Sequence, residues 1–245
     1  MPANYITYGG KYTIGNTSGN NPTTGSNINT GANCKVIVLG ILVSGTSLIG
    51  SGPEFNGVNM TQIGSAVATS EGNVEMWYTM SNVASKSNAN VTYSNKFGIL
   101  TAGFVSWYDC ADTLYLGDTD TTFSTNGSGA QINLISPNNN SFVAVDVWHS
   151  GYSSVSGITN NRTELSTLDR GSVIGAAQYG ISTGTSTYAM LHTTPLSDDY
   201  AMIAASFYAS ETSSFASING VSYASMTSVD GVPKANIGNI DEVNF

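Results

Sequence analysis

The chain has 245 residues and a formal net charge of −9, and only 9% of its residues are charged, against about 25% in typical soluble domains. Sixteen acidic residues and seven basic ones argue against a nucleic-acid-binding protein, which needs a basic surface for phosphate contacts. Hydrophobic residues make up 40%, enough for a core, while Gly, Ser, Thr and Asn are abundant. Because these residues are poor helix formers, the composition favours an all-β protein.

The longest apolar run, Val36 to Val43, is interrupted by Gly40 and is far shorter than the roughly 18 residues of a membrane-spanning helix. We therefore expect no membrane insertion. The start of the chain, Met1-Pro2-Ala3-Asn4, lacks the basic and apolar segments of a secretion signal. Either the chain was trimmed or it does not use the general secretory route.

The first 34 residues are expected to form a hairpin followed by an arm. Tyr5–Tyr8 and Lys11–Ile14 alternate around the pair Gly9-Gly10, a pattern typical of a short β-hairpin. Asn16–Asn33 has almost no apolar residue except Ile28. This segment is interpreted as a flexible connection, or as an arm that only a neighbour orders.

From residue 35 to residue 210, short apolar or β-branched runs alternate with Gly, Asn, Ser or Pro. Short strands at this spacing, without a persistent helical stripe, predict an antiparallel β-sandwich. Val36–Val43 has the continuous apolar character of a strand at the centre of a sheet covered on both faces. The predicted strands are Lys35–Val43, Val58–Ile63, Val74–Met80, Asn90–Tyr93, Ile99–Tyr108, Ser141–Trp148, Arg162–Leu168, Ser172–Tyr179, Ser186–Leu191 and Tyr200–Tyr208.

Residues 211–245 contain an internal repeat with a period of eleven residues, and each unit has a second apolar residue three positions after the first. An eleven-residue period is compatible with a right-handed helical coil, but Asn-Gly and Asp-Gly within the units favour turns between very short strands. One unit cannot bury its own apolar face, so we expect a tail that mediates oligomerisation or attachment. Its predicted contact residues are Ile218, Val221, Val229, Val232, Ile240 and Val243.

Two parts of the chain resemble known sequences. Ser217-Ile-Asn-Gly-Val221 and Val229-Asp-Gly-Val-Pro-Lys-Ala-Asn-Ile237 resemble short repeats near the C-termini of tailed-bacteriophage virion proteins, although Glu242 replaces the glycine in the third unit. Phe55–Gly64, Val74–Tyr78 and Ala201–Ser206 are similar to a β-sandwich of phage and bacterial surface proteins. The second resemblance implies a jelly-roll-like sandwich and no shared active site.

Few residues point to catalysis or metal binding. His149 and His192 each end a predicted strand, and no Gly-x-Ser-x-Gly signature accompanies them. We expect two partly exposed side chains rather than catalytic or metal-binding groups. Two sets of acids are candidates, for Ca²⁺ and for glycoside hydrolysis, but the first is interrupted by Leu114-Tyr115-Leu116 and the second qualifies in number only. They are Asp109, Asp112, Asp118 and Asp120, and Glu54, Glu71, Glu75 and Glu164.

Aromatic and cysteine residues leave alternatives open. Tyr78, Tyr108 and Tyr152 lie next to or near tryptophans, and an outward-facing tyrosine among them could contact a glycan or a neighbouring subunit. Cys34 and Cys110 have no metal-ligand spacing. They are either one disulfide or, as the favoured alternative, two buried thiols.

Taken with the resemblance, these features predict a non-enzymatic structural component of a bacteriophage virion, such as a head-decoration, fibre or tail protein. It would assemble in the host cytoplasm as a homo-oligomer, for example a trimer, and attach to other virion proteins through its termini. A host surface glycan is a further expected partner, and no cofactor is expected. The alternative is a carbohydrate-binding or adhesin module of a cell-surface or extracellular protein.

Overall fold

Antiparallel β-strands make up almost all of the computed structural model, which describes residues 5–18, 23–44, 51–63, 67–68, 72–94, 100–135, 141–151, 158–169, 174–183 and 187–209, together with 217–218, 221–222, 228–229 and 232–233. No helix occurs among these residues. The all-β, antiparallel character predicted from the composition is confirmed. The chain divides into two units, Met1–Ser210 and Glu211–Phe245.

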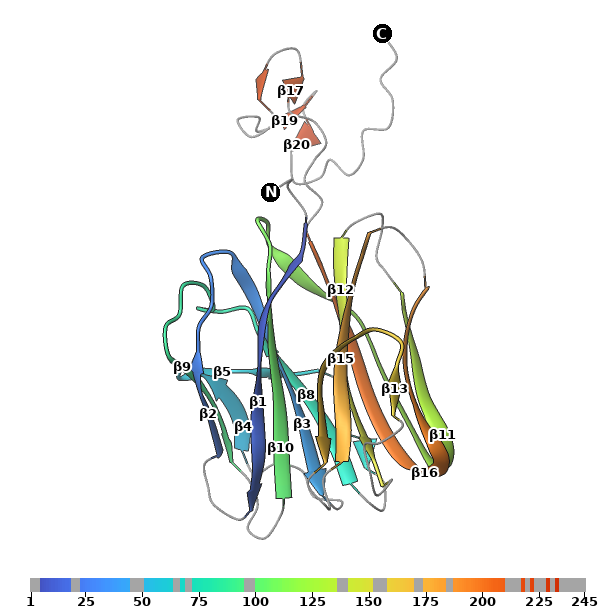
Figure 1. The fold of residues 1–245 in the computed structure, drawn as a ribbon. Coiled ribbons are helices and arrows are strands. Elements are labelled where there is room, and N and C mark those ends of the chain that lie inside the picture. The colour runs from blue at the N-terminus through green and yellow to red at the C-terminus, as the bar shows by residue number, and fades with distance from the viewer. Residues whose placement is uncertain are drawn as a thin grey trace. The chain divides into compact units, whose positions relative to one another are not determined.

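The first half of the larger unit forms two sheets (Figure 1). Sheet A has the order β1-β10-β3-β8-β6, with β7 also pairing with β8, and sheet B has the order β2-β9-β4-β5. The strands are β1 (Thr7–Ser18), β2 (Thr23–Ile28), β3 (Cys34–Ser44), β4 (Ser51–Phe55), β5 (Val58–Asn59), β6 (Thr61–Gln62), β7 (Val67–Ala68), β8 (Gly72–Thr79), β9 (Ala89–Ser94) and β10 (Leu100–Asp109).

The second half forms sheet C, with the order β11-β16-β12-β15-β14 and with β13 pairing with β16. Its register shifts between Ser124 and Gly129, so the β11–β16 ribbon has two regular parts: residues 114–124 with 200–209, and residues 129–135 with 187–193. The strands are β11 (Leu114–Ile135), β12 (Ser141–Ser150), β13 (Thr159–Asn160), β14 (Thr163–Asp169), β15 (Ile174–Thr183) and β16 (Thr187–Ala209).

The two halves share one pairing pattern. In the first half the first strand pairs with the last (β1 with β10), the second with the next-to-last (β2 with β9), and the third with the strand before that (β3 with β8). In the second half residues 114–124 pair with 200–209, residues 129–135 pair with 187–193, and β12 pairs with β15. The last strand also pairs with the third in both halves. Each half is therefore a folded-over antiparallel ribbon with the same strand order.

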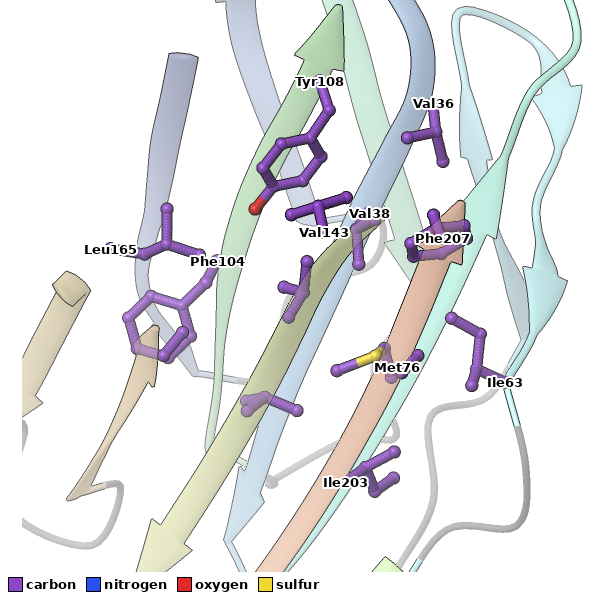
Figure 2. Close-up of a cluster of buried hydrophobic side chains, with 14 of the residues drawn as sticks. Val36, Val38, Ile63, Met76, Phe104, Tyr108, Val143, Leu165, Ile203 and Phe207 are labelled. Atoms are coloured by element: carbon purple, nitrogen blue, oxygen red, sulfur yellow. The ribbon is translucent and has the colours of Figure 1, made fainter. Parts of the chain in front are cut away.

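Three hydrophobic cores lie between the layers formed by the sheets. A central core lies between sheets A and C and includes Val38, Phe104, Val143, Ile203 and Phe207 (Figure 2). A first outer core lies between sheets A and B. A second lies between sheet C and the part of the ribbon formed by residues 129–135 and 187–193. Figure 1 shows sheet B, sheet A and sheet C in succession from left to right.

The central strands are buried on both faces because side chains alternate along a strand. In β3, Val36 and Val38 enter the central core, whereas Ile37 and Leu39 enter the first outer core. This double burial explains the continuous apolar run that the sequence shows from Val36 onward, as predicted.

The expected N-terminal hairpin is wrong. Residues 7–18 are one strand, β1, which pairs along its length with β10 and has a register shift between Tyr8 and Gly10. The glycine pair makes room for an indole ring instead of a turn: a Cβ on Gly10 would lie 2.2 Å from Trp107 Cζ2, and one on Gly9 would lie 2.5 Å from Trp107 Cδ1.

Two segments that were expected to be irregular are strands. Part of Asn16–Asn33 forms β2, whose Ile28 is fully buried in the first outer core. The acidic segment from Asp109 to Asp120 leads into β11, which was not predicted because Gly, Asp, Thr and Ser dominate it. The predicted strand Val58–Ile63 is wrong as a single strand, because it is divided into β5 in sheet B and β6 in sheet A. The other predicted strands are present, with boundaries shifted by a few residues, and Ser186–Leu191 and Tyr200–Tyr208 both belong to β16.

In the tail, two short antiparallel pairings lie eleven residues apart. Ile218 pairs with Val221 in β17 (Ser217–Ile218) and β18 (Val221–Ser222), and Val229 pairs with Val232 in β19 (Ser228–Val229) and β20 (Val232–Pro233). This backbone pairing agrees with turns between very short strands rather than a helical coil. Ile240 and Val243 lie outside the described residues.

The two cysteines are free and buried. Cys34 belongs to the first outer core and Cys110 to the central core, so their side chains enter different cores. The structure therefore agrees with two buried thiols rather than a disulfide.

We predict that Gly40→Ala destabilises the protein by about 1–3 kcal/mol, because overpacking a filled core costs that much. A Cβ on Gly40 in β3 would lie 2.8 Å from Val147 Cβ in β12. Chemical denaturation measures the loss. Adding Val147→Ala should make the double variant lose less than the sum of the single losses.

Gly52→Ala is the matched control, since its Cβ would meet only ordinary contacts, at 3.6 Å from the Trp77 ring. It should leave the denaturation midpoint nearly unchanged or raise it slightly. Equal midpoints for the Gly40 and Gly52 variants would contradict the tight contact between sheets A and C.

Candidate functional site

The most extensive buried polar cluster in the described residues is centred on an ion pair between Asp146 in β12 and His192 in β16. His192 Nε2 lies 2.8 Å from Asp146 Oδ1, and both side chains are fully buried. The imidazole also stacks on the indole of Trp148, with a centroid distance of 5.3 Å and an angle of 9° between the rings. The pair joins β12 of sheet C to residues 187–193, the part of β16 that folds over this sheet.

Neutral side chains satisfy the remaining hydrogen-bonding groups of the pair. The Gln178 side-chain amide donates to Asp146 Oδ2 (2.8 Å), and its backbone N–H donates to Oδ1 (3.2 Å). His192 Nδ1 lies 2.6 Å from Asn160 Oδ1, and Asn160 Nδ2 donates to Glu164 Oε2 (2.8 Å). Both ring nitrogens of His192 therefore have an oxygen atom as partner.

This geometry suits structural support better than catalysis. In a Ser-His-Asp triad, one ring nitrogen contacts the carboxylate and the other takes a proton from a hydroxyl nucleophile. Here the second nitrogen of His192 contacts the amide oxygen of Asn160. The expectation that His192 is a partly exposed strand-end side chain is wrong, because residues 187–193 fold over sheet C and bury it.

His149 is buried in a different way. It lies in β12 with 1% of its surface exposed, and neither ring nitrogen has a hydrogen-bond partner among the residues that the structure describes. Gly72 in β8 is its close neighbour across the two sheets, since a Cβ there would lie 2.5 Å from His149 Nε2. Burial lowers the pKa of His149 from 6.5 to about 4. The expected partial exposure is wrong here too, because β12 is covered on both faces.

The acidic residues do not gather into a site. Asp118 accepts hydrogen bonds from the backbone N–H groups of Thr119 (3.0 Å) and Ile135 (2.7 Å), and Asp120 accepts one from Thr121 (2.8 Å). Their carboxylates thus hold the backbone of β11. No group of three potential metal ligands occurs in the part of the chain that the structure describes.

The other acids are dispersed or engaged. Burial raises the pKa of Asp109, which lies at the end of β10. Glu54 is in sheet B, Glu75 in sheet A and Glu164 in sheet C. Glu75 is 1% exposed and accepts a hydrogen bond from Trp77 Nε1 (3.1 Å), whereas Glu71 lies outside the described residues.

Two of the three predicted surface tyrosines point into the protein. Tyr108 is fully buried in the central core, so the expectation that it contacts a glycan or a subunit is wrong. Tyr78 is half-buried and packs against Phe207 with a centroid distance of 5.6 Å. Both rings face sheet C, because sheet A is covered on that side. Tyr152 lies outside the described residues.

The exposed aromatic residues are different ones. Tyr5, Tyr115 and Phe123 have 51%, 47% and 61% of their surface exposed, and Tyr115 stacks on Tyr208 with a centroid distance of 5.6 Å. These residues, like Asp146 and Gln178, were not predicted from the sequence. For Asp146 a signal was present: a lone carboxylate within the apolar run from Phe142 to Trp148 indicates a buried partner.

Comparisons with protein-family models, curated proteins and solved structures find no match to this chain. Among the described residues, none belongs to a helix that is long and apolar enough to cross a membrane.

We predict that Asp146→Asn lowers the free energy of unfolding by about 3–5 kcal/mol, because removing one partner of a buried ion pair leaves an uncompensated group in the core. Urea denaturation at neutral pH measures the loss. Asp120→Asn, at an exposed position of β11, is the control and should stay within about 0.5 kcal/mol of the parent. Similar losses in both variants would contradict a structural role for the Asp146–His192 pair.

The protein should also lose stability in acid through His149. Its pKa is lower in the folded state than in the unfolded state, so the unfolded state binds the additional proton as the pH falls from 6.5 toward 4. The contribution is fully present above pH 6.5. At pH 4 its loss amounts to about 3 kcal/mol, since one pKa unit corresponds to about 1.4 kcal/mol.

His149→Leu removes this titration and keeps an apolar side chain in the core. Denaturation midpoints of the parent and the variant between pH 4 and pH 8 should therefore diverge, with the variant less sensitive to acid. Parallel pH profiles would show that His149 does not cause the acid sensitivity.

Proposed function

We propose that this chain is a non-enzymatic structural component of a bacteriophage virion, built from two jelly rolls and attached through its C-terminal tail. The observation that carries the proposal is the pairing pattern that both halves share. A jelly roll arises when a long antiparallel ribbon folds over, so that its first strand pairs with its last and its second with its next-to-last. Jelly rolls are common in viral capsid proteins and in lectin domains.

The burial of the potentially reactive groups supports a non-enzymatic role. His192 and Asp146 are enclosed with all their hydrogen-bonding atoms engaged, and His149 lies between two sheets. The carboxylates of Asp118 and Asp120 bind neighbouring backbone N–H groups. An active site needs a nucleophile, an acid or a base that a substrate can reach, and these residues do not provide one.

The tail supports attachment. Its paired strands are only two residues long, and the Ile218–Val221 and Val229–Val232 pairs recur with the same eleven-residue spacing. Ordering a residue costs roughly 1–2 kcal/mol, and isolated two-stranded hairpins are at best marginally stable in water. Contacts with other chains, such as three tails around one axis or a socket on the particle, would supply the missing burial.

The alternative function is a carbohydrate-binding or adhesin module. The observation that favours it is the half-exposed ring of Tyr115, which stacks on Tyr208 at the edge of sheet C. Exposed aromatic rings present flat apolar faces of the kind that stack on sugars. Glycan binding that is lost in Tyr115→Ala, with assembly intact, would favour this function over the virion component.

The tail provides the direct test of the virion proposal. In full-length chains, Val221→Asp together with Val232→Asp should abolish assembly and incorporation into particles, because the new charges would be buried without partners in the contact. Analytical ultracentrifugation measures assembly. Mass spectrometry of purified particles produced by the genome that encodes the chain measures incorporation.

Ser217→Asp together with Ser228→Asp is the matched control. It adds the same charge to the same hairpins at the positions directly before Ile218 and Val229, and successive residues of a β-strand belong to opposite faces. The control should still assemble and enter particles. Particles that incorporate the valine variant as well as the parent would refute attachment through the tail.

A further inference from the structure

The edge strand β11 combines unusual length with exposed apolar side chains. It has 22 residues and lies at one end of the strand order of sheet C. Three of the four large hydrophobic residues that the structure shows as exposed belong to it: Tyr115, Phe123 and Ile135. Ile135 has 66% of its surface exposed, the highest value of the four.

Short length, basic residues and proline, which often protect a sheet edge, are missing from β11, although its register shifts at three places before Gly129. Natural proteins keep edge strands short or place Lys or Pro on them, because an open row of backbone N–H and C=O groups can pair with another chain. The edge strands β5, β6 and β7 have only two residues each, and β1 includes Lys11. In contrast, β11 contains no Lys, Arg or Pro, and no charged residue follows Asp120.

The regular part of β11 from Gly129 to Ile135 has a well-defined outer side. Ala130, Ile132 and Leu134 are buried in the second outer core, whereas Gln131 and Asn133 are exposed. The backbone N–H of Ile135 donates to Asp118 rather than to β16. Because backbone groups alternate in direction along a strand, those of Gln131 and Asn133 also point away from β16, toward the open edge.

We propose that this edge pairs with the same edge of a second copy of the chain, antiparallel and with the twofold axis at Ile132. In that register Gln131 lies opposite Asn133 of the other copy, so each amide meets an amide. The exposed Ile135 lies opposite Gly129 of the other copy, which has no side chain to clash with it. The backbone groups of Gln131 and Asn133 can therefore pair with those of the other copy, while the N–H of Ile135 stays bound to Asp118.

Charge favours a second copy over a different partner. The chain carries a net charge of −9, so most contacts between two copies would bring acids together. Residues 121–135 themselves contain no charge, which limits this repulsion, and the carboxylate of Asp118, which reaches this edge, is bound to the backbone N–H of Ile135. The contact is independent of the tail and of the proposed virion function.

The wild-type full-length chain should dimerise reversibly through this contact. Sedimentation from about 1 to 200 μM should show a mass that rises with concentration toward twice the chain mass of 25.5 kDa, since a small interface of this kind binds in about the micromolar range.

Charge variants at the two amide positions test the register. Gln131→Lys with Asn133→Lys places like charges opposite each other and should raise the dimer Kd by about 30-fold or more. Gln131→Lys with Asn133→Glu places opposite charges in both cross-strand pairs and should retain the dimer. Mixing the double-lysine chain with one carrying Gln131→Glu and Asn133→Glu should restore association as a heterodimer.

The side chains of Gln131 and Asn133 are exposed, so all these variants should fold. Thermal melting followed by circular dichroism checks that they do. The same comparison in chains carrying Val221→Asp and Val232→Asp separates this contact from assembly through the tail, because the edge dimer should persist there. A wild-type chain that stays monomeric over the whole range would overturn the proposal. Equal association of the lysine–lysine and lysine–glutamate variants would overturn it as well.

Discussion

The face-to-face packing of sheets A and C is the constraint on which the rest of the larger unit depends. Each sheet is also covered on its other face, so the strands between the layers are buried on both sides. Such strands need apolar residues at successive positions, as in β3 and β12, rather than the alternation of a half-exposed strand. Close approach of the sheets also requires glycine where one backbone meets a branched side chain, as Gly40 meets Val147.

The buried polar side chains of the larger unit are accommodated in two different ways. Asp146 and His192 are kept by mutual pairing and by amide partners that satisfy their remaining atoms, which offsets the cost of removing charge from water. His149 has no hydrogen-bond partner among the described residues, and burial lowers its pKa to about 4, which keeps it neutral near pH 7. The first arrangement holds the folded-over layer of the second half, while we expect the second to make the contact between sheets A and C sensitive to acid.

Layered sheets bury their faces but leave their edge strands without a partner on one side. In this chain the edge strands differ in length and in residue type. Very short strands end sheets A and B on one side, and Lys11 of β1 donates to the backbone carbonyl of Leu165. β11, which is longer than the other strands at the ends of the three sheets, carries neither basic residues nor proline. In the proposed assembly, the edge of β11 and the tail are two separate contacts between chains.

The sequence by itself determined the fold class and most strand positions, because composition and local runs of apolar residues report directly on strand propensity and double burial. The spacing of eleven residues between Ile218 and Val229 led only to the expectation of a repeat in the tail. The sequence did not reveal β11, whose polar composition resembles that of a loop, because an edge strand is held by backbone pairing with its neighbour rather than by side-chain burial.

Tertiary structure alone decided which side chains are inside and which meet. Gly9-Gly10 has the local signature of a turn, but the indole of Trp107 occupies that space. Tyr108 and His192 stand at strand positions that local sequence would leave exposed, and both are fully buried. Burial at these positions depends on a second layer formed by residues distant in the chain, and a local pattern carries no information about which distant segments will cover it.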